Sequence, residues 1–206
     1  MSSSLTTLQG YVTDALGAAD TVSTNLATRG INLGQLLAAL LFKPPELQTS
    51  GSVPVSAAGT SVSLSTLTGL HSVMTVYNTT GSCPCHMVTR EKWDLIIPTF
   101  TGTVYVRFYN RLGSTLYVNA PTADNVLLVK YFKLPTTLTA GGQTLDFDNY
   151  DYFITEVATR YAWACKEEPD SSKVFADLMA EYTQAYSVGG KLREEVQEAL
   201  KSGYNV

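Results

Sequence analysis

Two cysteines and a histidine lie within four consecutive residues, Cys83-Pro84-Cys85-His86. Thiolate and imidazole groups are the ligands that zinc prefers, but a closed structural site needs four of them. Cys165 and His71 could complete such a set, although neither shows the paired spacing of a zinc site. A C-x-C pair also closes poorly into a disulfide. We therefore interpret these residues as a tight loop with two incidental thiols, and we expect no metal and no cofactor.

A catalytic triad or dyad needs a histidine base that a third group orients. His71 and His86 are the only histidines, and neither lies near a nucleophile-elbow motif. The acidic cluster Asp146, Asp148 and Asp151 lacks the glycine and the closing glutamate of a calcium loop. A helix N-terminus explains these acids, because the helix dipole favours negative charge there. No acid–base pair or activated nucleophile can be assembled, so we expect that the protein is not an enzyme.

Four cations lie among tyrosines in the middle of the chain, namely Arg107, Arg111, Lys130 and Lys133. Basic and aromatic side chains on one sheet face can bind single-stranded nucleic acid by stacking and charge. The alternative is a half-buried sheet on which cationic stems cover the tyrosines. Four cations are too few for a groove that follows phosphates, which favours the alternative. A mildly basic wall around a DNA channel stays open.

Apolar spacing predicts helices in the first part of the chain. One stripe recurs at intervals of three and four over residues 5–16, and a second covers residues 33–41. Asn25 and Gly30 are expected to punctuate the chain between the stripes. Pro44-Pro45 ends the second stripe, since proline removes a hydrogen-bond donor. With few caps and few charges, these helices should depend on packing against other elements or other subunits.

Short β-type segments begin near Val53. Thr103–Tyr109 alternates apolar with polar or aromatic residues, which predicts a half-buried strand. Asn110–Gly113 then reads as a turn, and Thr115–Asn119 and Val126–Leu134 read as two further strands. Because each connection is short, we expect the three strands to form an antiparallel meander.

Helical patterns return in the last third of the chain, where Phe153, Val157, Tyr161 and Cys165 recur every four residues. After a break at Pro169, two further apolar faces contain Val174, Phe175, Leu178, Met179, Tyr182 and Tyr186, then Leu192, Val196, Ala199 and Leu200. The predicted class is α+β. It comprises an N-terminal helical segment (1–50), a central antiparallel β-sheet or sandwich (51–142) and a C-terminal helix bundle (143–206).

Composition narrows the class of protein. Charged residues make up 16% of the chain, where about 25% is ordinary, and the hydrophobic share of 45% is typical. A formal net charge of −4 gives no basic field for phosphate backbones. The longest apolar run, Leu36–Phe42, is far shorter than the roughly 20 residues of a membrane span. Without the basic start of a secretory signal, we expect a soluble protein made in a reducing compartment.

The order of these segments resembles that of a known family over roughly residues 53–186. The segments that carry the likeness are Ser56–Tyr77 with Met87–Asp94, Gly113–Pro121, Leu127–Pro135, and Asp148–Glu168 with Val174–Tyr186. They are similar to the strands and the C-terminal helix pair of the head-to-tail adaptor (connector) proteins of tailed bacteriophages. The N-terminal part departs from that pattern, with a Ser/Thr/Gly-rich stretch in place of a polar amphipathic helix.

The resemblance implies a virion structural protein of the neck, at the head-tail interface, made in the host cytoplasm. Such proteins assemble as a homo-oligomeric ring, commonly of twelve copies, between the portal protein and tail or nozzle proteins, with DNA in the channel. Portal contacts are expected at Val174, Phe175, Leu178, Tyr182, Tyr186, Leu192, Val196 and Leu200. The four cations, Arg107, Arg111, Lys130 and Lys133, are expected at the channel or at a subunit interface.

The charge distribution fits a ring on independent grounds. Residues 71–142 carry six basic and three acidic side chains, whereas residues 143–206 carry six basic and twelve acidic ones. Ring contacts between identical subunits join two different faces, and these two regions could supply them. Two other functions stay open, namely another neck, tail-ring or head-completion protein, and a β-sandwich module that binds glycans through Trp93, Tyr105 and Tyr109.

Overall fold

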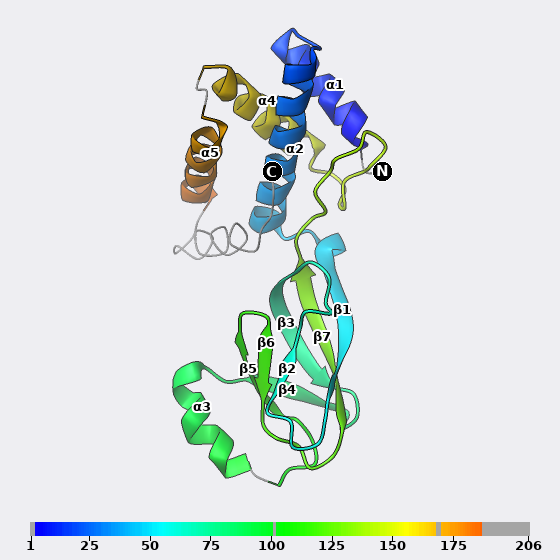
Figure 1. Ribbon diagram of the computed structural model, residues 1–206, viewed down its shortest axis with the longest axis vertical. Helices are drawn as coiled ribbons and strands as arrows, with labels where there is room; N and C mark the ends of the chain where they lie inside the picture. Colours follow the sequence, from blue (N-terminus) through cyan, green and yellow to red (C-terminus); the bar gives the residue numbers. More distant parts are fainter. Residues whose placement is uncertain (1–2, 101, 168–169, 187–206) are drawn as a thin grey trace. The chain divides into compact units, whose positions relative to one another are not determined.

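The computed structural model describes residues 3–100, 102–167 and 170–186, and the chain divides into two compact units (Figure 1). Residues 1–47 and 134–206 form one, which we call the helical unit, and residues 48–133 form the other, the β unit. The helical unit is therefore built from both ends of the chain. The predicted α+β class, with helices at both ends and strands in the centre, is confirmed.

The helices of the helical unit begin and end at local sequence signals. They are α1 (Leu5–Leu16), α2 (Thr21–Phe42), α4 (Asp151–Glu167) and α5 (Ser171–Tyr186). Ser4 and Asp20 cap α1 and α2, because their side-chain oxygens accept hydrogen bonds from N–H groups of the first turn. Gly17 ends α1 in the left-handed conformation. No helix within the described residues is long and apolar enough to span a bilayer.

The expected punctuation at Asn25 and Gly30 is wrong, because α2 runs through both residues. Gly30 instead lets α2 approach α4 closely, since a Cβ atom there would lie 2.7 Å from the Cα of Ala158. Gly34, about one turn later, meets α4 in the same way, with a Cβ 2.8 Å from the carbonyl oxygen of Ile154. These glycines therefore serve the packing of two helices from opposite ends of the chain.

The helical core lies between α2, α4 and α5. Its buried members are Leu33, Leu36, Leu37, Leu40, Val157, Tyr161, Val174, Leu178, Met179 and Tyr182. The core confirms that the apolar stripes predicted for these helices face inward. It joins residues more than a hundred positions apart in the sequence, so most of the stability of α2 comes from tertiary packing rather than from helix propensity.

Buried amides of α2 hold the segment that returns from the β unit. The Asn32 side chain donates to the carbonyl of Leu138 at 3.0 Å and accepts from the Leu138 N–H at 2.8 Å. Gln35 donates to the carbonyl of Thr136 at 2.9 Å. Because a buried backbone group without a partner is costly, these bonds allow the irregular chain at 136–138 to lie against a helix.

The β unit contains a seven-stranded sheet with the order β1-β7-β3-β4-β5-β6-β2. Its elements are β1 (Gln48–Val55), β2 (Ser61–Ser63), β3 (Leu70–Asn78), β4 (Cys83–Met87), α3 (Arg90–Ile96), β5 (Phe108–Leu112), β6 (Thr115–Val118) and β7 (Asn125–Lys133). Single-turn 3-10 helices lie at Pro45–Leu47, before β1, and at Ile97–Phe100, after α3. All strand pairs are antiparallel except β4 with β5. The core includes Val53, Val76, Val106, Leu116, Leu127, Val129 and Tyr131.

Two details of the predicted meander are wrong. β5 begins at Phe108 and continues to Leu112, so the turn lies at Gly113, whose φ of +58° suits glycine, rather than over Asn110–Gly113. β7 pairs with β1 and β3 and does not pair with β6. The second neighbour of β6 is β2, which leaves no edge of β6 for β7. The strands predicted at Thr115–Asn119 and Val126–Leu134 are confirmed as β6 and β7.

Substitution of Gly34 by alanine should destabilise the protein. The new methyl would lie 2.8 Å from a backbone oxygen of α4, and overpacking of about 1–3 kcal/mol should outweigh a helix-propensity gain of about 1 kcal/mol. Gly10→Ala in α1 is the matched control, because nothing lies within 4 Å of its Cβ position. Urea unfolding of both variants tests this, and a Gly34→Ala variant more stable than the wild type would contradict the close approach of α2 and α4.

Candidate assembly surfaces

The Cys83-Pro84-Cys85-His86 sequence forms most of strand β4, so the interpretation as a loop is wrong. The Cys85 thiol is buried and donates to the carbonyl of Val106 at 3.4 Å. Burial, together with the neighbouring Cys83 thiol, raises the pKa of Cys85 to about 12. Because a metal ligand must be a thiolate, Cys85 acts as a core residue. Among the described residues no group of three or more potential ligands could hold a metal ion.

The segment predicted as the first strand is held by the side chain of Asn119. Its carbonyl oxygen accepts from the N–H groups of Arg107 and Phe108 at 2.8 and 2.9 Å. Its amide donates to the hydroxyl of Thr103 at 2.9 Å and to the carbonyl of Tyr105 at 3.3 Å. One buried amide therefore supplies hydrogen bonds that a neighbouring strand would otherwise provide.

Asn125 binds the same segment from the start of β7. Its carbonyl oxygen accepts from the N–H of Val106 at 3.2 Å and from the amide of Asn78. Its own amide donates to the carbonyls of Val104 and Ala123 at 3.0 and 2.7 Å. Val106 remains fully buried while the chain around it is irregular. Alternation of apolar residues thus predicted the burial of Val106 correctly, but it was wrong for Val104, which is exposed, for Tyr109, which is buried, and for the strand conformation of the residues before Phe108.

The four cations predicted at a channel or subunit interface do not form one cluster. Arg107 is exposed on the segment that the asparagines hold, and Arg111 donates to the carbonyls of Gly113 and His71. Lys130 is exposed in β7, and Lys133 is half-buried at its end. Lys130 and Lys133 are three positions apart on a strand, so they point to opposite faces. Their assignment to a channel or interface stays a prediction.

The residues predicted to contact a portal divide into two sets. Val174, Leu178 and Tyr182 are buried in the helical core, and Phe175 is half-buried beside them. Leu192, Val196 and Leu200, together with the side chain of Tyr186, lie outside the described residues. In the described part of α5, the predicted residues therefore pack against α2 and α4, and a contact between this set and a portal stays a prediction.

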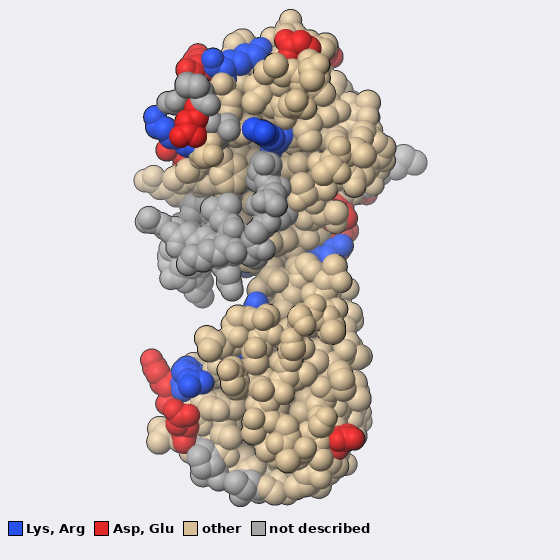
Figure 2. All heavy atoms as spheres, viewed as in Figure 1, with Lys and Arg blue, Asp and Glu red and all other residues tan. Residues whose placement is uncertain are grey.

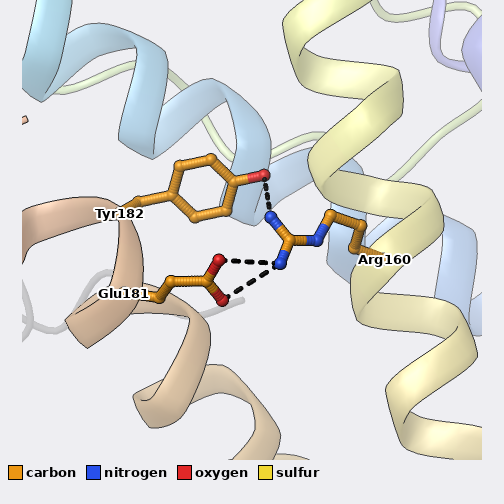
Figure 3. A network of polar contacts seen from close by, with 3 residues as sticks. All are labelled: Arg160, Glu181 and Tyr182. Carbon is orange, nitrogen blue, oxygen red and sulfur yellow. Dashed lines mark hydrogen bonds and ion pairs between the residues drawn. The ribbon is translucent and has the colours of Figure 1, made fainter. Parts of the chain in front are cut away.

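A polar network that the sequence did not reveal joins α4 to α5 (Figure 3). Arg160 donates to both carboxylate oxygens of Glu181, at 2.8 and 3.0 Å, and to the hydroxyl of Tyr182 at 3.0 Å. These bonds, first the one with Glu181, raise the pKa of Arg160. The guanidinium also lies 5.4 Å from the centre of the Tyr182 ring. Arg160 and Glu181 are 21 positions apart and lie on different helices, so the spacing of residues within one helix could not predict that they meet.

Charge differs between the two units. The β unit carries six lysines and arginines against three acidic residues, whereas the helical unit carries eight against fifteen. Figure 2 shows one face of the molecule, on which charged side chains are sparse and uncharged residues cover most of both units. This face therefore offers few cations for contact with phosphates.

The β unit also contains an apolar cavity of about 320 Å³ between the α3 region and β6. It is lined by Thr60, Trp93, Ile97, Phe100, Gly102, Tyr117, Val118 and Ala120. Ligand and hot-spot pockets share this combination of concave shape and aromatic walls. Sequence reasoning did not predict this cavity, although Trp93 had been singled out as a possible glycan contact.

The chain matches a known family over a range that includes both units. A family model described as SU10 adaptor protein matches residues 3–202. No curated protein matches the chain.

Replacement of Asn119 by alanine should loosen the 103–108 segment. Two partly buried backbone N–H groups lose their acceptor, and at about 1 kcal/mol for each lost bond we expect the free energy of unfolding to fall by roughly 2 kcal/mol. Amide hydrogen exchange at Arg107 and Phe108 should accelerate more than elsewhere in the β unit. Asn25→Ala, at an exposed position of α2, is the control. Unchanged exchange at both amides would show that Asn119 does not hold the segment.

Proposed function

This chain belongs to the SU10 adaptor protein family of phages, and on that premise we propose that it is a head-to-tail adaptor. It forms a ring between the portal protein and the tail or nozzle proteins, in the neck of the virion, and has a structural rather than a catalytic role. The observation that carries the proposal is the family match over residues 3–202, which includes the helical unit and the β unit together.

The architecture supports a ring of identical subunits. A ring requires two different complementary faces on each copy, and two units of opposite net charge provide distinct faces. Each unit has its own buried core, so both can serve as preformed surfaces. The low charged share of 16% is compatible with a surface that neighbouring subunits cover. We expect twelve copies, as in similar adaptors.

DNA passes through the centre of the proposed ring without being read. The exposed cations Arg107 and Lys130 give the β unit a mildly basic surface, and base-specific recognition would require convergent side chains in a groove. Weak contact with phosphates allows DNA to move along the channel, whereas a continuous basic groove would retain it.

The mass and shape of the assembled protein test this function. We expect the purified chain, alone or with its phage's portal protein, to form a closed ring coaxial with the portal in negative-stain images. In reconstructed virions it should lie between portal and tail. A chain that stays monomeric with the portal would contradict the proposal. Location elsewhere in the neck would identify another ring or head-completion protein, and monomers that bind a glycan array would identify a glycan-binding module.

A variant of the C-terminal segment tests which residues contact the portal. Simultaneous substitution of Leu192, Val196 and Leu200 by serine should weaken portal binding by about tenfold or more, because apolar anchors dominate such contacts. Thermal unfolding is measured in parallel, so that a loss of folding is distinguished from a loss of the portal contact. Val22→Ser, at an exposed apolar position of α2, is the control. Wild-type binding by the triple variant would overturn the assignment of this segment to the portal contact.

A further inference from the structure

One large aromatic side chain of the helical unit is almost completely exposed. Tyr152, in the first turn of α4, exposes 82% of its surface. Tyrosine is intermediate in burial among the residue types, and it is enriched at the hot spots of protein interfaces, where it fills a pocket of the partner. Asp151 precedes Tyr152 and the exposed Glu156 follows it by one helical turn. Tyr152 is therefore an aromatic anchor in an acidic setting.

The cavity of the β unit offers a matching site. Its volume of about 320 Å³ is sufficient for a phenol ring, and its walls include Trp93, Phe100 and Tyr117. Aromatic rings in contact stabilise one another beyond the apolar area that they bury. The lining is largely apolar, with Thr60 at an exposed position of the edge. A tyrosine of a partner could thus enter with its ring against the aromatic walls and its hydroxyl toward solvent.

The cavity and Tyr152 lie in units of opposite net charge. None of the residues that line the cavity is charged, and α3 carries Arg90 and Lys92 against Glu91 and Asp94. Arg90 lies three positions before Trp93, which places the two residues on the same side of the helix. The β unit as a whole has an excess of basic residues, and the helical unit has an excess of acidic ones. An exposed tyrosine on the acidic unit therefore suits an aromatic cavity on the basic unit, and Tyr152 is such a residue.

We propose that Tyr152 of one copy inserts into the α3 cavity of a second copy, with Glu156 facing Arg90. The inference rests on the proposed ring and identifies its subunit contact. Because anchor and cavity are different surfaces of the same chain, the contact is heterologous, and each copy can bind one neighbour on each side. Such contacts propagate from copy to copy until the ring closes.

Trp163 is a second exposed aromatic residue of α4, and it can be compared with Tyr152. It lies on α4, exposes 48% of its surface, and contacts the Lys166 ammonium at 5.4 Å from the ring centre. A basic neighbour makes Trp163 a poorer match for a cavity in the basic unit. Trp163→Ser therefore removes an exposed aromatic residue from the same helix without removing the proposed anchor, and it serves as the matched control for Tyr152→Ser.

Two defective variants test the contact by complementation. Tyr152→Ser removes the anchor, and Ala120→Phe fills the cavity. Each alone should associate at least about 30-fold more weakly than the wild type, the effect of a hot-spot residue. An equimolar mixture should form one-to-one heterodimers in sedimentation velocity, because each pair retains one intact anchor and one intact cavity. Thr60→Trp is the second cavity variant, since Thr60 is exposed and tolerates a larger side chain.

The outcomes separate this inference from the proposed ring. If the wild type and Tyr152→Ser both form rings, the proposed Tyr152 contact is refuted, but the adaptor function is not. A wild-type chain that stays monomeric at every concentration and with portal would overturn both. Failure of the two variants to form heterodimers, while each is folded and monomeric, would contradict a contact between copies. Equal loss of association in Trp163→Ser would contradict Tyr152 as the anchor.

Discussion

The close approach of α2 and α4 is the constraint on which the rest of the chain depends. Gly30 and Gly34 bring the two helix backbones within the distance that a side chain would occupy. Since α2 precedes the β unit and α4 follows it, this contact closes the chain around an inserted domain. The insertion is compatible with that closure because β1 and β7 are neighbours, and Gln48 pairs with Phe132 where the chain enters and leaves the sheet.

In both units, buried side-chain amides provide hydrogen-bond partners for irregular backbone that lies against a core. In the helical unit, Asn32 and Gln35 satisfy the chain at 136–138. In the β unit, Asn119 and Asn125 satisfy the chain around Val106. An amide offers a donor and an acceptor without charge, so it can replace a missing strand at low desolvation cost. A chain with few charged residues can therefore still bury polar backbone.

The sequence was sufficient for properties that depend on local periodicity. The apolar stripes of α1, α2 and α4 predicted their buried faces, and β6 and β7 were located closely. It was insufficient where the conformation of a segment depends on a residue that is distant in the sequence. The break expected at Gly30 was wrong because this glycine serves a contact with Ala158, which is 128 positions away. The strand expected over residues 103–109 begins only at Phe108, because Asn119 and Asn125, which lie outside the segment, provide the hydrogen-bond partners of the residues before it. The Arg160–Glu181 pair and the α3 cavity likewise depend on packing between elements.

The few charged residues of this chain are divided unequally between its two units. Net charge normally keeps a protein soluble and its copies apart, and here the charges are few and are divided between an acidic and a basic unit. Between two copies, like units repel and unlike units attract, so electrostatics favours contacts that join the basic unit of one copy to the acidic unit of another. The proposed ring is one arrangement that satisfies this preference at every contact.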